Sequence, residues 1–235
     1  MKGRPYDPTI STEALTPREA AISTMESPLT PVALRVLGVL IEKELSTPDY
    51  YPMTLNALTN GCNQKSNRDP VMELSEAQVQ DGVDELFRHR LAGHASGAGS
   101  RAVKIRHAAA EHWGLQRKEL AALACLLLRG PQTIGEIKGR TTRMADFADL
   151  EDTADALRRL RDQEPSLLVQ LPVQPGKKEA RMAHLLAGPI DLEALEAQAA
   201  PVAPPVSSMR LELDDMKARL EALEEAFDAF RKQFE

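Results

Sequence analysis

Histidine and cysteine are the side chains most able to hold a metal or act as nucleophiles, and this chain has few of them. The five histidines are His89, His94, His107, His112 and His184. None has metal-ligand spacing, and His184 alternates with its neighbours as a satisfied histidine of a strand would. Cys62 has no second cysteine or histidine beside it, and Cys125 lies in an apolar run where a thiol packs as core. We therefore expect no metal, no cofactor and no catalytic residue.

Carboxylates gather at two places where helical periodicity starts. These are Glu76 and Asp81 in the first half of the chain and Glu151, Asp152 and Asp155 in the second. Two carboxylates can act as general acid and base. Acidic side chains in the first turns of helices, however, usually cap the helix or interact with its dipole. We favour the structural interpretation, and with no phosphate-binding glycine loop or nucleophile elbow present, the sequence predicts a non-enzyme.

A polar segment at residues 61–75 fits neither helical nor strand periodicity. Its candidate binding residues are Asn63, Gln64, Lys65, Asn67 and Arg68. Their donors could grip a phosphate or a peptide backbone. They could also hold the loop to its own domain, with Arg68 pairing with Asp69 or Glu73, since a loop without regular bonds must satisfy its backbone. We favour the internal role; solvent-facing side chains would favour binding.

Basic residues gather at two predicted β-hairpins and one further connector. They are Arg101, Lys104 and Arg106 at the first hairpin, Lys177, Lys178 and Arg181 at the second, and Arg140 and Arg143 between them. Such residues could attract phosphates. The helices that would read bases carry carboxylates instead, which repel phosphates within a Debye length of about 8 Å. Conventional reading of the major groove is therefore disfavoured.

The net charge of −6 is unevenly distributed. Residues 191–235 carry 5 basic and 11 acidic side chains, whereas residues 31–107 carry 9 of each and residues 113–190 carry 12 and 10. The acidity thus belongs to the C-terminal tail, and the overall charge does not exclude a nucleic-acid partner. No apolar run approaches the roughly 20 residues that cross a bilayer and no signal peptide is evident, so we expect a cytoplasmic protein.

The elements that must position these residues follow one order twice. From Pro31 an apolar stripe predicts a first helix, followed by a short extended piece, a second helix after Thr54, a third at 75–90 and a hairpin around 97–99. A stripe from Leu120, a short helix at 133–140, a helix at 150–160 and a hairpin at 167–185 repeat this order. Helix, strand, helix, helix and hairpin is the order of a winged helix.

The sequence therefore predicts a mainly α (α+β) chain with two tandem winged-helix domains, each with its own compact core. We expect a disordered N-terminal extension at 1–28, domains at 29–110 and 111–188, a linker at 189–207 and a coiled-coil-like helix at 208–235. In the predicted C-terminal helix, apolar residues recur at alternating spacings of four and three: Met209, Leu213, Met216, Leu220, Leu223, Phe227, Phe230 and Phe234. A heptad stripe of this kind favours a homodimer over folding back onto its own domains.

Several segments resemble the YceH-like family of bacterial proteins, which has no assigned biochemical function. They are Leu29-Thr30-Pro31, Tyr51-Pro52-Met53, the connector Cys62-Asn63-Gln64-Lys65-Ser66-Asn67-Arg68-Asp69-Pro70-Val71-Met72-Glu73-Leu74-Ser75, Leu128-Arg129-Gly130-Pro131-Gln132-Thr133 and Pro175-Gly176-Lys177-Lys178-Glu179. The resemblance covers residues 29–188 and implies tandem winged helices, in many members followed by a heptad tail. It supplies no catalytic residue.

Two functions remain open at this stage. One is a regulator or adaptor that binds DNA through its wings and polar connector. The other is a scaffold that binds only protein, as tandem winged helices do in chromosome-partition accessory proteins, an analogy of fold alone. We place DNA contact ahead of the purely protein-binding role.

Overall fold

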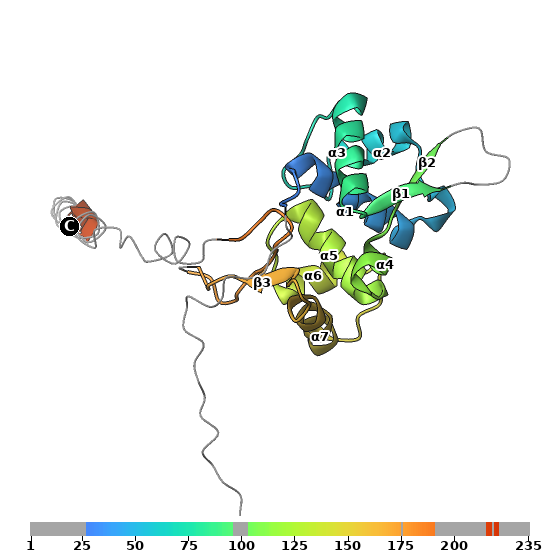
Figure 1. The fold of residues 1–235 in the computed structure, drawn as a ribbon. Helices are drawn as coiled ribbons and strands as arrows, with labels where there is room; N and C mark the ends of the chain where they lie inside the picture. The colour runs from blue at the N-terminus through green and yellow to red at the C-terminus, as the bar shows by residue number, and fades with distance from the viewer. Residues whose placement is uncertain (1–26, 96–102, 175, 191–214, 218, 221–235) are drawn as a thin grey trace, which may run out of the picture.

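The computed structural model describes residues 27–95, 103–174, 176–190, 215–217 and 219–220, and it confirms a mainly helical chain with a few short strands (Figure 1). The expectations for residues 1–26 and for most of the tail fall outside this range. Within the described residues, no helix is both long enough and apolar enough to cross a bilayer.

The first unit runs from α1 to β2. Its helices are α1 (Pro31–Ser46), a short 3-10 turn η1 (Pro48–Tyr50), α2 (Leu55–Cys62) and α3 (Glu76–Arg88). An antiparallel hairpin, β1 (Ala92–Ala95) and β2 (Lys104–His107), follows with Ala92 opposite His107. Met53, just before α2, forms a bridge to Ile105 and adds a third segment beside β2.

The second unit repeats this arrangement after a short linking helix. The link is α4 (Ala109–Trp113), a helix that the sequence periodicity did not predict. The domain boundary expected between residues 110 and 111 falls inside this helix. The unit contains α5 (Arg117–Arg129), α6 (Ile134–Arg140), α7 (Leu150–Arg161), β3 (Leu168–Gln170) and β4 (Met182–His184). Gln132 bridges to Met182 just before α6, as Met53 bridges to Ile105 just before α2.

Side-chain caps fix where the helices begin. Thr30, Thr54 and Asp149 each accept a hydrogen bond from a backbone N–H in the first turn of α1, α2 and α7. Ser75 and Thr133 form complete capping boxes at α3 and α6. Because the first-turn N–H groups of a helix have no partner within it, these caps set the boundaries that the sequence indicated.

The core does not divide into two. The most extensive helix–helix contact is between α1 and α5, the first long helix of each unit, and one cluster of buried apolar residues runs through both units. Every residue of α1 from Ala33 to Ile41 is buried, because the other helices of its unit and α5 surround it. Val79, Val83 and Leu86 of α3 face this core as expected, but the expectation of a separate core in each unit is wrong.

Two glycines let α1 be packed so closely. A Cβ on Gly38 would lie 2.9 Å from Leu128 Cδ2 and 3.1 Å from Leu127 Cβ of α5. A Cβ on Gly61 of α2 would lie 2.7 Å from Val39 of α1. All three distances are shorter than ordinary carbon contacts, so a larger side chain at either position would displace the neighbouring side chains.

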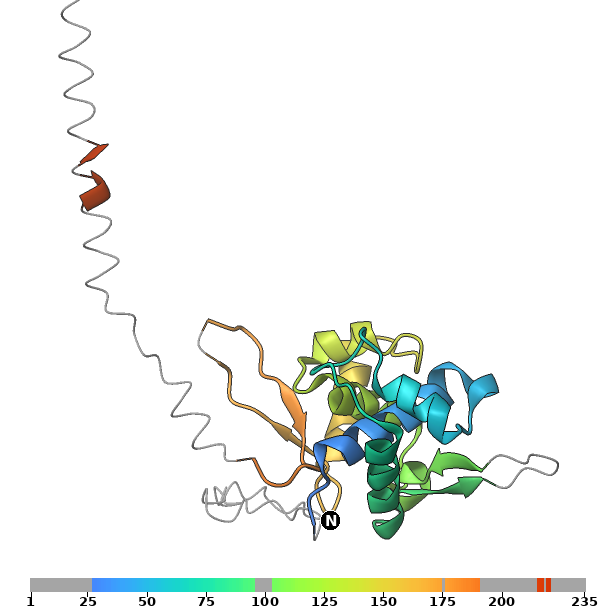
Figure 2. The same cartoon turned by 90° about the horizontal axis from the view of Figure 1, so that it is seen from above.

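The ends of the two units are also joined. The backbone N–H of Leu29, just before α1, donates to the carbonyl of Leu186 after β4 at 2.8 Å. The two hairpins project from opposite sides of the molecule (Figure 2). The surface between the units is therefore bounded by helices and their connectors and not by the hairpins.

Replacing Gly38 by leucine tests the close contact between the units. We expect Gly38→Leu to lower the free energy of unfolding by about 1–3 kcal/mol, because the added side chain overpacks the α1–α5 contact. Urea denaturation followed by circular dichroism measures this. The matched control is Gly139→Leu in α6, where a Cβ meets no atom within 4 Å. That variant should be unchanged or more stable by up to about 1 kcal/mol, and equal losses in both would contradict the packing argument.

Candidate nucleic-acid interface

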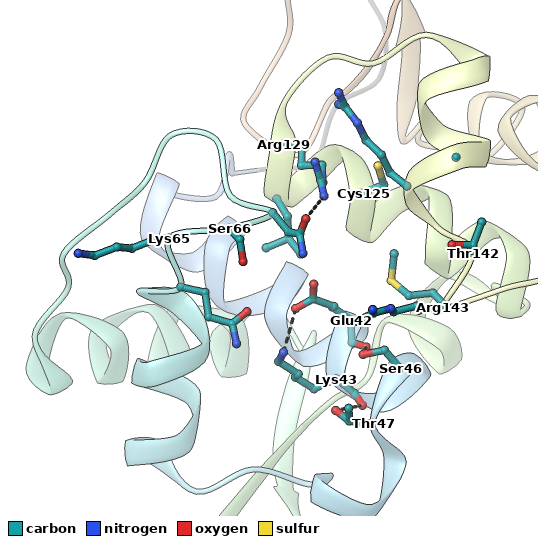
Figure 3. Close-up of a pocket in the computed structure, with 16 residues that line it drawn as sticks. Glu42, Lys43, Ser46, Thr47, Lys65, Ser66, Cys125, Arg129, Thr142 and Arg143 are labelled. Carbon is teal, nitrogen blue, oxygen red and sulfur yellow. Dashed lines mark hydrogen bonds and ion pairs between the residues drawn. The ribbon is translucent and has the colours of Figure 1, made fainter.

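A groove with a volume of about 860 Å³ lies where the two units meet (Figure 3). The last turns of α1 and α5 form two of its sides, and the connectors that follow α2 and α6 form the others. Its lining residues are Glu42, Lys43, Ser46, Thr47, Gln64, Lys65, Ser66, Asn67, Cys125, Leu128, Arg129, Gly139, Arg140, Thr142, Arg143 and Met144. Each unit thus supplies about half of the groove.

The lining is strongly basic. Its charged lining residues are Lys43, Lys65, Arg129, Arg140 and Arg143 against one carboxylate, Glu42, although the Lys65 side chain points outward in Figure 3. That carboxylate is already compensated, because Arg68 and Lys43 contact its Oε2 at 2.6 and 3.5 Å. The hydroxyls of Ser66 and Thr142 add neutral donors, whereas those of Ser46 and Thr47 already donate to the carbonyls of Glu42 and Lys43, at 2.6 and 3.3 Å. A surface of this composition attracts anions.

Arg68 holds the connector in place from inside. Its guanidinium donates to both carboxylate oxygens of Glu42, at 2.6 and 3.2 Å, and to the side chain of Gln64 at 3.0 Å. It also donates to the carbonyl of Gly61 at 3.0 and 3.2 Å, and it is almost fully buried. The internal role favoured for Arg68 agrees with these contacts, but the expected partners, Asp69 and Glu73, are wrong; the partner is Glu42 of α1.

A second buried arginine completes this arrangement at the end of α2. Arg35 of α1 donates to the carbonyls of Cys62 and Pro70 at 3.1 and 2.5 Å. The last carbonyls of a helix have no partner within it and carry partial negative charge, so Arg35 and Arg68 satisfy the C-terminal end of α2. Burial, followed by the nearby Arg68 charge, lowers the pKa of Arg35 below its usual value.

The amides of the connector divide between internal and external roles. Asn63 exchanges two hydrogen bonds with the backbone of Leu74, each at 2.8 Å, and so closes the loop on itself. Asn67 is exposed, has a positive φ of 61° and accepts a hydrogen bond from Arg129 of the second unit. The N–H of Asp69 donates to the carbonyl of Leu128 at 2.8 Å. The connector therefore spans the junction between the units and leaves Lys65 exposed.

The two thiols are not suited to nucleophilic chemistry. Burial raises the pKa of Cys125, at the edge of the groove, to about 11 and the pKa of Cys62 to about 12. Both thiols are therefore protonated at neutral pH, and a protonated thiol is a poor nucleophile. Among the described residues, no group of three or more His, Cys, Asp or Glu is placed to hold a metal ion.

The basic residues predicted at the hairpins lie outside the groove. Lys104 and Arg106 lie on β2, and Arg106 donates to Glu111 at 2.8 Å. Lys177 and Lys178 are exposed beyond β3, while Arg181 donates to the Pro131 carbonyl at 2.7 Å and pairs with Glu136 at 3.1 Å. Arg101 lies outside the described residues.

The third helix of each unit offers little to a base edge. Gln78 is used in the capping box of α3, and Asn56 of α2 donates to Glu76 at 3.1 Å. In α7, Asp152 accepts from Lys118 at 2.6 and 2.8 Å. Glu76 and Asp152 are thus bonded within the protein.

Two further expectations concern His184 and the C-terminal tail. His184 is not satisfied as expected: its Nδ1 has no partner among the described residues, and burial lowers the pKa of His184 to about 4, so the ring is neutral. Of the predicted oligomerisation residues, Met216 and Leu220 are described and exposed. Leu213, Leu223, Phe227, Phe230 and Phe234 lie outside the described residues.

Five of the predicted binding residues line this one groove, although they belong to two separate connectors of the sequence. They are Gln64, Lys65, Asn67, Arg140 and Arg143. Lys43 and Arg129 were missed. The available signal was that both are basic residues in the last turn of the first long helix of a unit. The packing of α1 on α5, which brings those ends to one groove, has no local signature in the sequence.

Residues 29–177 match a family described as "Protein of unknown function, DUF480". The chain belongs to this family of uncharacterised bacterial proteins, which confirms the resemblance noted in its motifs, and the matched range contains every residue that lines the groove.

Relatives match over most of their length. A UPF0502 protein of Vibrio vulnificus (strain YJ016) is 47% identical over 208 residues, covering 86% of this chain and 93% of the relative. A UPF0502 protein of Geobacter metallireducens is 46% identical over 227 residues, covering 90% and 100%. One from Citrifermentans bemidjiense is 51% identical over 174 residues, covering 74% and 80%. These names state no activity.

Replacing Arg68 by methionine tests the internal role of this side chain. We expect Arg68→Met to lower the free energy of unfolding by about 3–5 kcal/mol, because it leaves the Gly61 carbonyl without its donor and Glu42 with only the 3.5 Å contact to Lys43. Lys65→Met, in the same connector but exposed, should change stability by less than about 0.5 kcal/mol. Guanidinium denaturation of both variants gives the comparison; a loss below about 1 kcal/mol for Arg68→Met would contradict this role.

Proposed function

We propose that this protein is a non-catalytic nucleic-acid-binding protein built from two winged helices, and that it holds the phosphate backbone of DNA in the basic groove between them. The single observation that carries the proposal is that five basic residues, contributed by both units, line one groove whose carboxylate is already paired.

The winged-helix assignment is supported by the repeated element order. In each unit three helices are followed by an antiparallel hairpin, and a segment just before the second helix bridges to the returning strand of that hairpin. A helix-turn-helix closed by such a ribbon is the winged-helix arrangement. We keep the heptad stripe of the tail as a prediction of self-association.

The groove supplies the kind of contacts that bind backbones. Lysine and arginine neutralise phosphates, and hydroxyl side chains such as Ser66 and Thr142 commonly bond phosphate oxygens. The groove is also rigid, because Arg68 and Asn63 hold the connector and α1 is packed on α5. A preformed site loses less conformational entropy on binding.

Base reading through the third helices is not part of this proposal. The polar side chains at the starts of α3 and α7 are bonded within the protein, and the exposed ones include the carboxylates Asp81 and Glu151. Backbone contacts without base contacts give affinity that depends on salt and little on sequence.

Binding to a fluorescent duplex of mixed sequence, measured by anisotropy at several salt concentrations, tests the proposal. We expect binding at low salt, with an affinity that falls steeply as salt rises. Reversing two groove charges, Lys65→Glu with Arg143→Glu, should weaken binding at least about tenfold and reduce the salt slope by about 1 for each phosphate that is no longer neutralised.

Two double reversals with the same change in net charge serve as controls. Lys177→Glu with Lys178→Glu tests the second hairpin, which DNA binding through the wings would require. Arg158→Glu with Arg161→Glu tests α7, where both side chains are exposed and paired with Asp155 and Asp162. Failure to bind at low salt, or equal losses from the α7 and groove reversals, would overturn the proposal.

A further inference from the structure

The second unit has an apolar groove that the proposed DNA contact does not use. It has a volume of about 510 Å³ and lies between the starts of α6 and α7 and the β3–β4 hairpin. Its floor is formed by Ile134, Gly135, Leu150, Ala180 and Met182, and Glu151, Gln170 and Glu179 complete the lining. The Leu150 side chain is 56% exposed although it is large and apolar.

The corresponding place in the first unit is spanned by a hydrogen bond between two side chains. Thr54 and Thr133 cap the second helices of the two units, so Asn56 and Gly135 are equivalent positions, two residues after the cap. Ser75 and Asp149 cap the third helices, so Glu76 and Leu150 are equivalent. In the first unit Asn56 donates to Glu76 at 3.1 Å across this place. In the second unit a glycine and an exposed leucine replace that pair and leave the groove open.

The chemistry of the open groove is specific. An apolar floor favours burial of an aliphatic or aromatic side chain. Glu151 and Glu179 are both exposed at the rim, where they would repel phosphates and attract lysine or arginine. This groove is therefore unlike the basic one between the units and does not suit nucleic acid.

We propose that this groove docks a short segment of a partner protein in which an apolar side chain is flanked by lysine or arginine. The apolar side chain packs on Leu150, Ile134 and Met182, and its basic neighbours pair with Glu151 and Glu179. The chain's own tail is the competing occupant: residues 191–235 carry 11 acidic and 5 basic side chains, which the rim repels overall, but Phe230 is followed by Arg231 and Lys232, so the test includes a tail peptide. The proposal is independent of DNA binding in the basic groove.

Selection from a displayed library of random short peptides on the full-length protein tests the proposal directly. We expect the enriched peptides to share one apolar residue next to lysine or arginine. Added to protein with labelled methionine methyl groups, such a peptide should shift the Met182 resonance and leave that of Met53 unchanged. Met53 is the control because it lies near the corresponding place in the first unit and is equally buried. Met53 is 5% exposed and Met182 is 6% exposed.

The first unit suggests the loss-of-binding variant. Gly135→Asn with Leu150→Glu introduces the hydrogen-bonded pair of the first unit, and a Cβ at residue 135 has room, with its nearest atom at 4.0 Å. This variant should keep its fold and bind the peptides at least about tenfold more weakly, since it removes the apolar anchor. Glu151→Gln with Glu179→Gln should weaken binding less and flatten its salt dependence.

Four outcomes would overturn the proposal. The first is that the protein enriches no peptides beyond those bound by the Gly135→Asn, Leu150→Glu variant, and the second is that the peptides bind without shifting the Met182 resonance. The third is that a synthetic peptide of residues 208–235 shifts that resonance. The fourth is that the Gly135→Asn, Leu150→Glu variant has a lower particle mass in solution than the unchanged protein. The last two would assign the groove to the chain's own tail or to a second copy. None of them bears on DNA binding, which the groove reversals test separately.

Discussion

The close packing of α1 on α5 is the constraint on which the rest of the structure depends. It merges the apolar faces of two similar units into one core, and Gly38 favours the close approach because a Cβ there would lie 2.9 Å from the Leu128 side chain of α5. The same packing brings the last turns of both helices, with Lys43 and Arg129, to one groove. The basic site therefore exists only in the assembled pair of units.

Buried charge serves that assembly. Arg35 and Arg68 lie within or beside the apolar core and would be costly there without partners. Their partners are the carbonyls that end α2, the connector backbone and Glu42 of α1, so these bonds join the irregular connector to two helices. One result is a polar connector whose inner side chains are structural while Lys65 is exposed for binding. The other result is that the single carboxylate in the groove is already paired, so it leaves no uncompensated negative charge there.

Much of the fold was predictable because its signals are local. The apolar stripe from Pro31 and the cap residue Thr54 depend on residues a few positions apart, and α1 and α2 form where these patterns indicated. The short helix α4 was missed because five residues are too few to show periodicity. The separate cores were predicted wrongly because an apolar stripe shows that a face is buried and does not show against what.

The candidate site was predictable only in part for the same reason. Composition marked the connector at 61–75 and the pair Arg140 and Arg143 as polar and basic, and the structure places them on one groove. The partner of Arg68 could not be predicted, since Glu42 lies on another helix and nothing in the spacing favours it over Asp69. The apolar groove of the second unit became visible only when equivalent positions of the two units could be compared, because Gly135 and Leu150 are unremarkable in isolation.

The central claim is that the two units form one cooperative structure through α1 and α5. Native-state hydrogen exchange at increasing denaturant tests it most directly, because it reports the opening free energy of each amide. We predict that slowly exchanging amides of Leu37 in α1 and Leu123 in α5, both fully buried, converge on one unfolding free energy and one denaturant dependence. Two separate values, with one unit opening while the other stays protected, would contradict it.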